Sequence, residues 1–336
     1  MIVALNANPS LDRTVLIPDF AAGTLSRVPR ILLLAGGKAF NVARALRTLG
    51  VTSTVLAPLG GPMGDVVSQL ARAEGLPCER IAIAGDTRTC LTIVDPTTRR
   101  LTEIYEAGPH LQDGEWGRIV DSLMAVAAGV RLAVVCGSFL PGAPSSGLRD
   151  IVERLTATGV PVAVDTYGVQ LAQALAARPT VVKINAHEAA ALVGRTADEP
   201  VAALAAAAEI QARGARSVVI TLGARGAAGV DVGGQRFAWA APRMSGLYTV
   251  GSGDSFLAGM VAALEEGQSL TDAARLGVAA GAANTEEMGA AVLARARGGV
   301  ARPGAAALRL GRPKCPRPCS FLGAKRGSVQ QKAAWA

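Results

Sequence analysis

The chain has 336 residues, half of them hydrophobic, with 34 basic, 26 acidic and five cysteine residues. This length suits one large α/β domain or two smaller ones, and the composition can bury a sizeable core. No apolar run reaches the ~18–20 residues of a membrane helix. Because residues 1–5 also lack the basic start and the length of a signal peptide, we expect a cytoplasmic protein with no membrane partner. An odd number of cysteines argues against a disulfide framework.

The basic excess belongs to the end of the chain. Ten basic residues follow Glu287, the last acidic residue, and the part before them has 24 basic against 26 acidic residues. From about residue 290, Ala, Arg, Gly and Pro dominate and helical periodicity fades, so we expect residues 290–336 to form an atypical, poorly ordered basic tail. Its aromatic residues are only Phe321 and Trp335, which disfavours nucleic-acid binding.

The first part of the chain predicts a buried strand, a small sheet and two helices. The small sheet is expected from two extended runs of limited burial, about 12–34 and 88–105, and the Pro96-Thr97-Thr98 turn makes the second run a hairpin. The other elements expected here are strand 2–7, helix 39–49, strand 52–57, helix 65–74 and strand 81–84.

Helices and strands then alternate. The expected elements are helix 115–128, strand 132–136, helix 145–157, strand 161–165, helix 170–176, strand 180–184, helices 188–193 and 201–213, strand 217–221, hairpin 227–240, and helices 254–265 and 270–284. Such alternation predicts an α/β fold with a mostly parallel sheet covered on both faces. Ligands of these sheets bind beyond the carboxyl ends of the strands. Polar residues follow several predicted strands, namely Asp165, Asn185, Glu188, Thr221 and the turn before Asp254.

The stretch from Thr249 to Gly259 combines a glycine turn, a carboxylate and the start of a helix. Gly251 and Gly253 let the backbone turn tightly, and the following helix would direct its positive end and its free N–H groups at one spot. An anion fits there, and Asp254 beside it could accept a proton from a hydroxyl. These are the requirements of phosphoryl transfer to an alcohol. The alternative is a glycine turn in which Asp254 is an ordinary N-cap.

Two motifs near the start could bind a polyhydroxy ligand. The run Gly36-Gly37-Lys38-Ala39-Phe40-Asn41 places glycines, a cation and an amide at a helix start, and Asp12 follows the first strand. The alternatives are a capped helix with a solvated lysine and an ordinary turn aspartate. A Walker site is excluded because Leu32 stands where its first glycine is needed and no Ser or Thr follows Lys38.

Three further segments offer phosphate or metal contacts. Arg88, at the edge of the small sheet, could bind phosphate bidentately or be a solvated edge charge. In Lys183-Ile184-Asn185-Ala186-His187-Glu188, an amide and a carboxylate suit Mg²⁺, and a capped helix start is the alternative. The strand end Thr221-Leu222-Gly223-Ala224-Arg225-Gly226 could support a nucleotide phosphate, although no dinucleotide fingerprint follows the first strand.

Together, three of these motifs make the chain resemble the ribokinase/PfkB family of carbohydrate kinases over roughly residues 1–289. They are Gly36-Gly37-Lys38 with Asn41, Lys183-Ile184-Asn185 with Glu188, and Gly251-Ser252-Gly253-Asp254. The resemblance implies a ribokinase-like three-layer α/β/α core with a mostly parallel sheet. It also implies that the small sheet is a lid, which in this family often builds a homodimer.

The segment Asn8-Pro9-Ser10-Leu11-Asp12, Arg88 and the run Gly137-Ser138-Phe139-Leu140-Pro141 resemble the family's hexose-phosphate branch, which includes 1-phosphofructokinase and tagatose-6-phosphate kinase. Asp254 is then implied to be the base, with the amides of Gly251, Ser252 and Gly253 receiving the transferred group. Residues implied to bind the sugar phosphate are Asp12, Gly37, Lys38, Asn41, Arg88 and Ser138. Those implied to surround ATP are Lys183, Asn185, Thr221, Gly223, Gly226 and Asn284, and Asn185 and Glu188 are implied to organise Mg²⁺, largely through water.

The implied reaction is ATP- and Mg²⁺-dependent phosphorylation of a sugar phosphate, with D-fructose 1-phosphate as the first choice. Tagatose 6-phosphate, fructose 6-phosphate and an unphosphorylated sugar remain alternatives, and a non-catalytic sugar-phosphate sensor is the alternative from another class. One departure from the family pattern is Ala39-Phe40, where Gly-Ile or Gly-Leu is usual. The extra methyl of Ala39 either crowds the substrate or only requires a helical backbone.

Overall fold

The computed structural model describes residues 1–293. Most of the basic tail expected from residue 290 therefore lies outside the described residues. Its first residues are described, and Ala290, Ala291 and Leu293 are buried against the body. The packed chain thus continues at least to Leu293, past the boundary expected at residue 289, because these small and apolar side chains fill space beside the last helices. No helix within residues 1–293 is both long and apolar enough to cross a bilayer.

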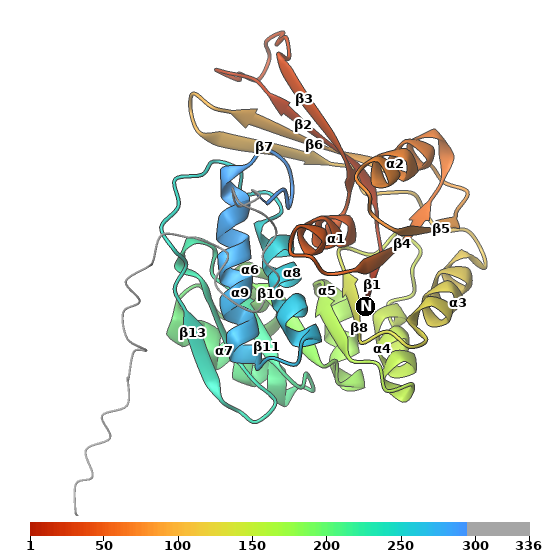
Figure 1. Cartoon of the computed structure of the whole chain (residues 1–336), viewed down its shortest axis with the longest axis vertical. Coiled ribbons are helices and arrows are strands. Elements are labelled where there is room, and N and C mark those ends of the chain that lie inside the picture. Colours follow the sequence, from red (N-terminus) through yellow and green to blue (C-terminus); the bar gives the residue numbers. More distant parts are fainter. Residues whose placement is uncertain (294–336) are drawn as a thin grey trace, which may run out of the picture.

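The centre of the molecule is a sheet of nine strands in the order β13-β12-β11-β10-β9-β8-β1-β4-β5 (Figure 1). Its strands are β1 (Ile2–Asn6), β4 (Ser53–Leu59), β5 (Cys78–Ala82), β8 (Leu132–Cys136), β9 (Val162–Asp165), β10 (Val181–Asn185), β11 (Val218–Thr221), β12 (Ala227–Val230) and β13 (Arg236–Trp239). Among the described strands of this sheet, only β12 near one edge runs antiparallel to its neighbours, β11 and β13. This is the mostly parallel sheet expected from the alternating pattern.

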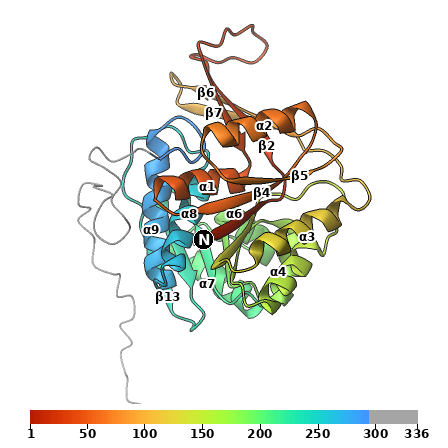
Figure 2. The same cartoon turned by 45° about the vertical axis from the view of Figure 1, so that its right-hand side comes forward.

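Helices cover both faces of this sheet (Figure 2). The helices are α1 (Lys38–Thr48), α2 (Gly61–Ala73), α3 (Glu115–Ala127), α4 (Gly147–Ala157), α5 (Gly168–Ala174), α6 (Ala186–Val193), α7 (Pro200–Ala212), α8 (Ser252–Glu265) and α9 (Leu270–Ala283). Alternate strand residues enter opposite layers: Val3 and Leu5 pack with α3 to α7, whereas Ile2 and Ala4 pack with α1, α2, α8 and α9. The period-2 geometry of a strand therefore builds two apolar cores and three layers.

A separate small sheet lies beyond one end of the central sheet (Figure 1). It consists of β2 (Ser10–Leu16), β3 (Arg30–Gly36), β6 (Arg88–Asp95) and β7 (Arg100–Tyr105), in the order β3-β2-β6-β7. Both pieces of sequence expected to form it are present, and 88–105 is the predicted hairpin. β3 leads through Gly36 and Gly37 directly into α1, so the base of the small sheet adjoins the start of that helix.

Helix α2 begins at Gly61, four positions before the expected start at Asp65. Pro62 occupies the first turn, where a missing N–H costs nothing and the fixed φ favours the helix. Periodicity failed here because Gly61 and Pro62 lower the helix propensity of a segment that tertiary packing nevertheless holds in a helix.

Candidate active site

The polar residues that follow the central strands meet at one edge of the sheet. Cys136 of β8 pairs with Asp165 of β9, and Asn185 of β10 pairs with Thr221 of β11, so these neighbouring strands end together. Helix α8 begins at the same edge, because the Lys183 ammonium of β10 reaches Gly253 of its first turn. The edge expected to bind a ligand is thus lined by these strand ends and by α8.

Asp254 lies in the first turn of α8 and is only 7% exposed. Gly251 is the N-cap, in the left-handed conformation (φ 82°), and Asp254 makes no capping hydrogen bond. Instead, its Oδ2 accepts a hydrogen bond of 2.8 Å from Nδ2 of Asn41 in α1. The ordinary N-cap interpretation is therefore wrong, and a buried carboxylate in this position can accept a proton from a hydroxyl placed beside it.

The turn before Asp254 presents free backbone N–H groups. The first helical hydrogen bond of α8 runs from Ser255 N to Gly251 O, and Ser252 N is held by Thr249 O. The N–H groups of Gly253 and Asp254 lie between them at the positive end of the helix, where an anion is stabilised. A Cβ on Gly251 would lie 2.4 Å from Ala291 N, so only glycine fits this turn.

Two lysines converge on one buried carboxylate. Asp165 is fully buried, and its Oδ1 and Oδ2 each accept a 2.7 Å ion-pair hydrogen bond, from Lys38 Nζ and Lys183 Nζ respectively. Lys183 Nζ also lies 3.1 Å from the point that a Cβ on Gly253 would occupy. Asp165 therefore holds one cation at the start of α1 and a second one against the glycine turn of α8.

These charges set the protonation of the site. Burial raises the pKa of Asp254, although the nearby Lys38 opposes this effect. Burial also works against ionised Asp165, but Lys183 and Lys38 hold the pKa of its carboxyl below the usual value. For Lys38, burial alone would lower the pKa, and Asp165 together with Asp254 raises it well above normal. The result is a Lys38 ammonium that stays charged beside a carboxylate with increased proton affinity.

The diglycine turn is enclosed by two side chains. A Cβ on Gly36 would lie 2.1 Å from Oδ1 of Asp12, and a Cβ on Gly37 would lie 2.6 Å from Oδ1 of Asn6. Gly37 also has φ 93° and ψ 156°, a conformation restricted to glycine, and Asn6 donates to Gly36 O at 2.9 Å. Burial raises the pKa of Asp12, against the hydrogen bond from Ser10.

The Ala39-Phe40 departure has a simple structural account. Both residues lie in the first turn of α1 and are fully buried in the apolar core that α1 shares with α8. The methyl group of Ala39 thus points into packed apolar surroundings, and it needs only a helical backbone. Of the two alternatives given for Ala39, the structure therefore favours the requirement for a helical backbone and contradicts crowding of the substrate.

Arg88 and Ser138 lie around Asn8, at the junction of the small sheet and β8. Arg88 Nη2 donates to Asn8 O at 3.0 Å, and Asn8 Nδ2 donates to Ser138 Oγ at 3.2 Å. Within residues 1–293, Arg88 Nε and Asn8 Oδ1 are the two buried side-chain polar atoms without a hydrogen-bond partner. A donor and an acceptor left unpaired in one cluster are expected where a polar ligand completes the hydrogen bonding.

Asn185 and Glu188 form a capping box at the start of α6. Asn185 Oδ1 accepts from Glu188 N, and Glu188 Oε2 accepts from Asn185 N, both at 2.9 Å. The helix-capping alternative is therefore correct as a description of these contacts. Glu188 Oε1 makes no hydrogen bond to the described residues, so a carboxylate oxygen remains for a hydrated cation. No group of three or more His, Cys, Asp and Glu side chains in this part of the chain forms a metal cage.

The residues expected around ATP have different environments. Thr221 ends β11 and Gly223 has open space around it, whereas a Cβ on Gly226 would lie 1.9 Å from Trp239 O. Gly226 is thus explained by the packing of the β12–β13 hairpin. Asn284 is fully buried, and its Nδ2 contacts Tyr248 O, Val250 O and Ser252 Oγ. The Asn284 amide holds the turn before Asp254, and its expected place beside ATP stays a prediction.

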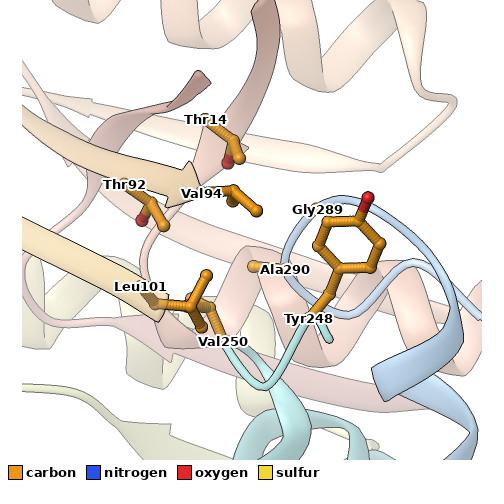
Figure 3. A pocket seen from close by; sticks show the side chains of 8 residues that line it. All are labelled: Thr14, Thr92, Val94, Leu101, Tyr248, Val250, Gly289 and Ala290. Carbon is orange, nitrogen blue, oxygen red and sulfur yellow. The ribbon is translucent and has the colours of Figure 1, made fainter. Parts of the chain in front are cut away.

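The small sheet rests on the segments that surround this turn. Figure 3 shows Thr14, Thr92 and Val94 on its inner face opposite Tyr248 and Gly289 across a small cavity. Arg99, in the β6–β7 turn, also donates to Ser245 O at 2.8 Å. The small sheet is therefore seated on the same chain segments that support the start of α8.

Asn6 and Arg44 take part in the site but were given no role from the sequence, and Asn8 was noted only as the first residue of the segment Asn8-Pro9-Ser10-Leu11-Asp12. Asn6 is the last residue of the first strand and Asn8 follows it closely, and this position at the strand end was the available signal for both. Arg44 lies in a predicted helix with no local sign of its partners. Asp165 was noted as a strand-end residue, but its pairing with two lysines could not be deduced.

The fold and this site define a class of protein. In it, a buried carboxylate, two cations and a helix N-terminus surround one place for an anionic group. The model of the pfkB family of carbohydrate kinases matches residues 7–296. The chain belongs to this family.

Named relatives agree with that assignment. The chain is 33% identical over 282 residues to 1-phosphofructokinase of Xanthomonas campestris pv. campestris, covering 82% of this chain and 88% of the relative. It is 32% identical over 290 residues to ATP-dependent 6-phosphofructokinase isozyme 2 of Escherichia coli K12, covering 86% and 93%. A crystal structure of phosphofructokinase-2 from E. coli in complex with potassium superposes with a TM-score of 0.81 at 31% identity, covering 88% and 95%.

Proposed function

We propose that the protein transfers a phosphoryl group from ATP to a hydroxyl of a sugar phosphate, converting fructose 1-phosphate into fructose 1,6-bisphosphate. The observation that carries this proposal is the buried Asp254, which is held by Asn41 next to free N–H groups at the start of α8. The relatives named 1-phosphofructokinase and 6-phosphofructokinase isozyme 2 favour a fructose phosphate as acceptor.

The proposed chemistry uses the geometry of this turn. Asp254 accepts the proton of the acceptor hydroxyl as that oxygen attacks the terminal phosphorus of ATP, and the bond from this phosphorus to the bridging oxygen breaks to release ADP. The N–H groups of the glycine turn and the nearby Lys183 offset the charge on the transferring group. Asp12, Gly37, Lys38 and Asn41 surround the sugar, and the small sheet above them excludes water that would otherwise hydrolyse ATP.

Mg²⁺ fits the donors at the start of α6. It is usually held by one or two protein oxygens with several waters and substrate phosphates, rather than in an all-protein cage. Glu188 Oε1 and the exposed Asn185 are the protein groups proposed to hold it through water, near Thr221 and Gly223, where ATP is proposed to lie. Bound there, the ion would neutralise charge on the phosphates.

An ADP-release assay coupled to a dehydrogenase tests the reaction and the substrate together. Purified protein with ATP and Mg²⁺ is offered fructose 1-phosphate, fructose 6-phosphate, tagatose 6-phosphate and fructose at matched concentrations. We expect the highest kcat/KM for fructose 1-phosphate. A higher value for another acceptor would replace the substrate assignment, and no release with any of them would favour a sugar-phosphate sensor. Omission of Mg²⁺ from the same assay tests whether ADP release requires the metal.

Arg88→Gln is expected to raise the KM for a phosphosugar roughly 10–100-fold, because one charge-assisted contact with the existing phosphate is lost. The KM for ATP should change little. The matched control is Arg80→Gln, which removes an exposed arginine paired with Asp65. Initial rates over a range of both substrates provide these constants. An unchanged KM for the phosphosugar would remove Arg88 from the phosphate site.

The outer face of the small sheet supports a homodimer. Ile31, Leu33 and Ile104 are 47%, 40% and 57% exposed. Leu33 and Ile104 share this face, since Leu33 pairs with Arg13, Arg13 with Leu91, and Leu91 with Ile104. We expect the native protein to be dimeric and Leu33→Lys to be monomeric in light scattering, because a charge would be buried without a partner. Equal masses for both proteins would exclude this interface.

The cytoplasmic location expected from the sequence stays a prediction.

A further inference from the structure

Arg44 of α1 is a buried arginine whose five N–H donors are all used. Its Nε and Nη2 donate to Glu74 Oε2 and Oε1 at 2.5 and 3.1 Å, which makes a two-pronged ion pair. Nη2 also donates to Ala35 O at 2.6 Å. Nη1 donates to Asn41 Oδ1 at 2.8 Å and to Ala290 O at 2.9 Å. A planar guanidinium can hold four fixed partners at once, whereas the ammonium of a lysine cannot.

One of these contacts fixes the base of the small sheet. Ala35 O accepts from Arg44, and Ala35 N donates to Glu74 Oε1 at 3.0 Å. Both backbone polar groups of Ala35 are therefore held by the ion pair. Ala35 directly precedes the Gly36-Gly37 turn, so the place where β3 enters α1 is tied to α2.

A second contact orients the amide that faces Asp254. An arginine can only donate hydrogen bonds, so the atom of Asn41 that faces Arg44 must be the carbonyl oxygen. The Nδ2 group of Asn41 is then directed at Asp254 Oδ2, 2.8 Å away. The Asn41 amide is thus held at both ends, its oxygen by Arg44 and its nitrogen by Asp254, and without Arg44 only the contact with Asp254 would orient it.

The third contact supports the glycine turn of α8. Arg44 holds Ala290 O, and the backbone of Ala290 and Ala291 packs directly on Gly251. The neighbouring Gly289 lies against Leu32 and Leu34 of β3. The same guanidinium thus contacts the base of the small sheet and Asn41 directly, and it supports the turn that precedes Asp254 through Ala290.

We infer that Arg44, with Glu74 as its counterion, is a positioning residue that couples the seating of the small sheet to the orientation of Asp254. Its effect on catalysis rests on the proposed role of Asp254 as the base. Arg44 does not contact the substrate in this assignment. It acts through Asn41, Ala35 and Ala290.

The test is Arg44→Lys, which keeps a cation beside Glu74 but loses the planar guanidinium and its two-pronged ion pair. We expect kcat to fall roughly 10–100-fold, the effect of losing one or two hydrogen bonds to a charged donor, while the KM for ATP changes less than about threefold. Arg47→Lys, three positions further along the same helix and exposed, is the matched control and should keep the native kcat. Native-like kcat in Arg44→Lys overturns the inference.

A double-mutant cycle separates positioning from a general loss of packing. Asn41→Ala and Arg44→Lys are each expected to lower kcat, and the double variant should lose less than the product of the two separate losses, because part of the effect of Arg44 passes through Asn41. Fully additive losses would show that Arg44 does not work through this amide. Asp254→Asn is assayed in parallel, so that a wrong assignment of the base is recognised separately from a wrong role for Arg44.

A pH profile of kcat adds a readout that packing alone would not move. The charged groups facing Asp254 are Lys38 from α1, Asp165 from β9 and Lys183 from β10, and all of them are retained in Arg44→Lys. The hydrogen bond from Asn41 lowers the pKa of Asp254, so its loss should move the acid limb to higher pH. An unmoved acid limb contradicts the inference. If Arg44→Lys does not fold, the pair Arg44→Gln with Glu74→Gln removes both buried charges together and is assayed in the same way.

Discussion

Asp254→Asn is expected to lower kcat by roughly 10²–10⁴-fold, the usual contribution of a general base. Asparagine has nearly the same shape as aspartate and can still accept the hydrogen bond from Asn41, but it cannot take up the proton of the acceptor hydroxyl. Binding of ATP should be nearly unchanged, because the glycine turn keeps its conformation. Steady-state ADP release measures kcat, and calorimetric titration with ATP measures binding.

The matched control for this variant is Asp272→Asn. Asp272 occupies the first turn of the neighbouring helix α9, where it is exposed and bonded to Ser269. Its replacement should leave kcat within about twofold, as for most surface substitutions. Full activity of Asp254→Asn would exclude Asp254 as the base and would leave the reaction without the group on which the proposal depends.

The native enzyme should also lose activity in acid at a pH set by Asp254. Burial raises the pKa of this carboxyl above its ordinary 3.8, with Lys38 opposing the shift. A base works only when ionised, so kcat should decrease as the pH falls through this raised pKa. In Asp254→Asn, this acid limb should be missing from the residual activity.

Asp165→Asn is expected to have the second largest effect, because it acts on stability and activity together. Asp165 is fully buried and carries the ion pairs to both Lys38 and Lys183. Removing one partner of a buried ion pair typically costs about 3–5 kcal/mol, since the remaining charge is left uncompensated. Both lysines would also lose the anchor that holds Lys38 at the start of α1 and Lys183 against the glycine turn of α8. Urea unfolding and ADP release measure the two effects.

The pH dependence of this loss has a definite sign. The two lysines hold the pKa of Asp165 below its unfolded value of 3.8. The carboxylate therefore contributes stability above that pH and loses the contribution as the pH falls through the folded pKa. The difference in unfolding free energy between native protein and Asp165→Asn should be largest near neutral pH and shrink in acid.

Asp121→Asn provides the comparison for Asp165→Asn. Asp121 pairs with Arg154 on the surface, at 3.3 Å, and such exposed pairs contribute about 0–1 kcal/mol. If Asp165→Asn were no more destabilising than Asp121→Asn, the two-lysine arrangement would not be a stabilising part of the site.

Local sequence patterns predicted most of the elements. Short, nearly continuous apolar runs that alternate along the chain with helical patterns identified the central strands. Such runs can be read locally, because neighbouring residues alone decide whether a strand can be buried on both faces. The glycine turn at 251–253 was found in the same way, since only glycine tolerates such a backbone. Strand ends also indicated where Asp165, Asn185 and Thr221 would meet, because parallel strands bring their carboxyl ends to one edge.

The sequence by itself therefore determined the layers, the small sheet and the edge that carries the site. Only the tertiary structure decided which charges meet there. Lys38 and Asp165 are 127 positions apart, and Arg44 reaches Ala290 across 246 positions. Asn284 holds the turn before Asp254 from more than 30 positions away. Periodicity and turn chemistry depend on near neighbours along the chain, whereas buried ion pairs depend on which side chains the packed layers bring within hydrogen-bonding distance.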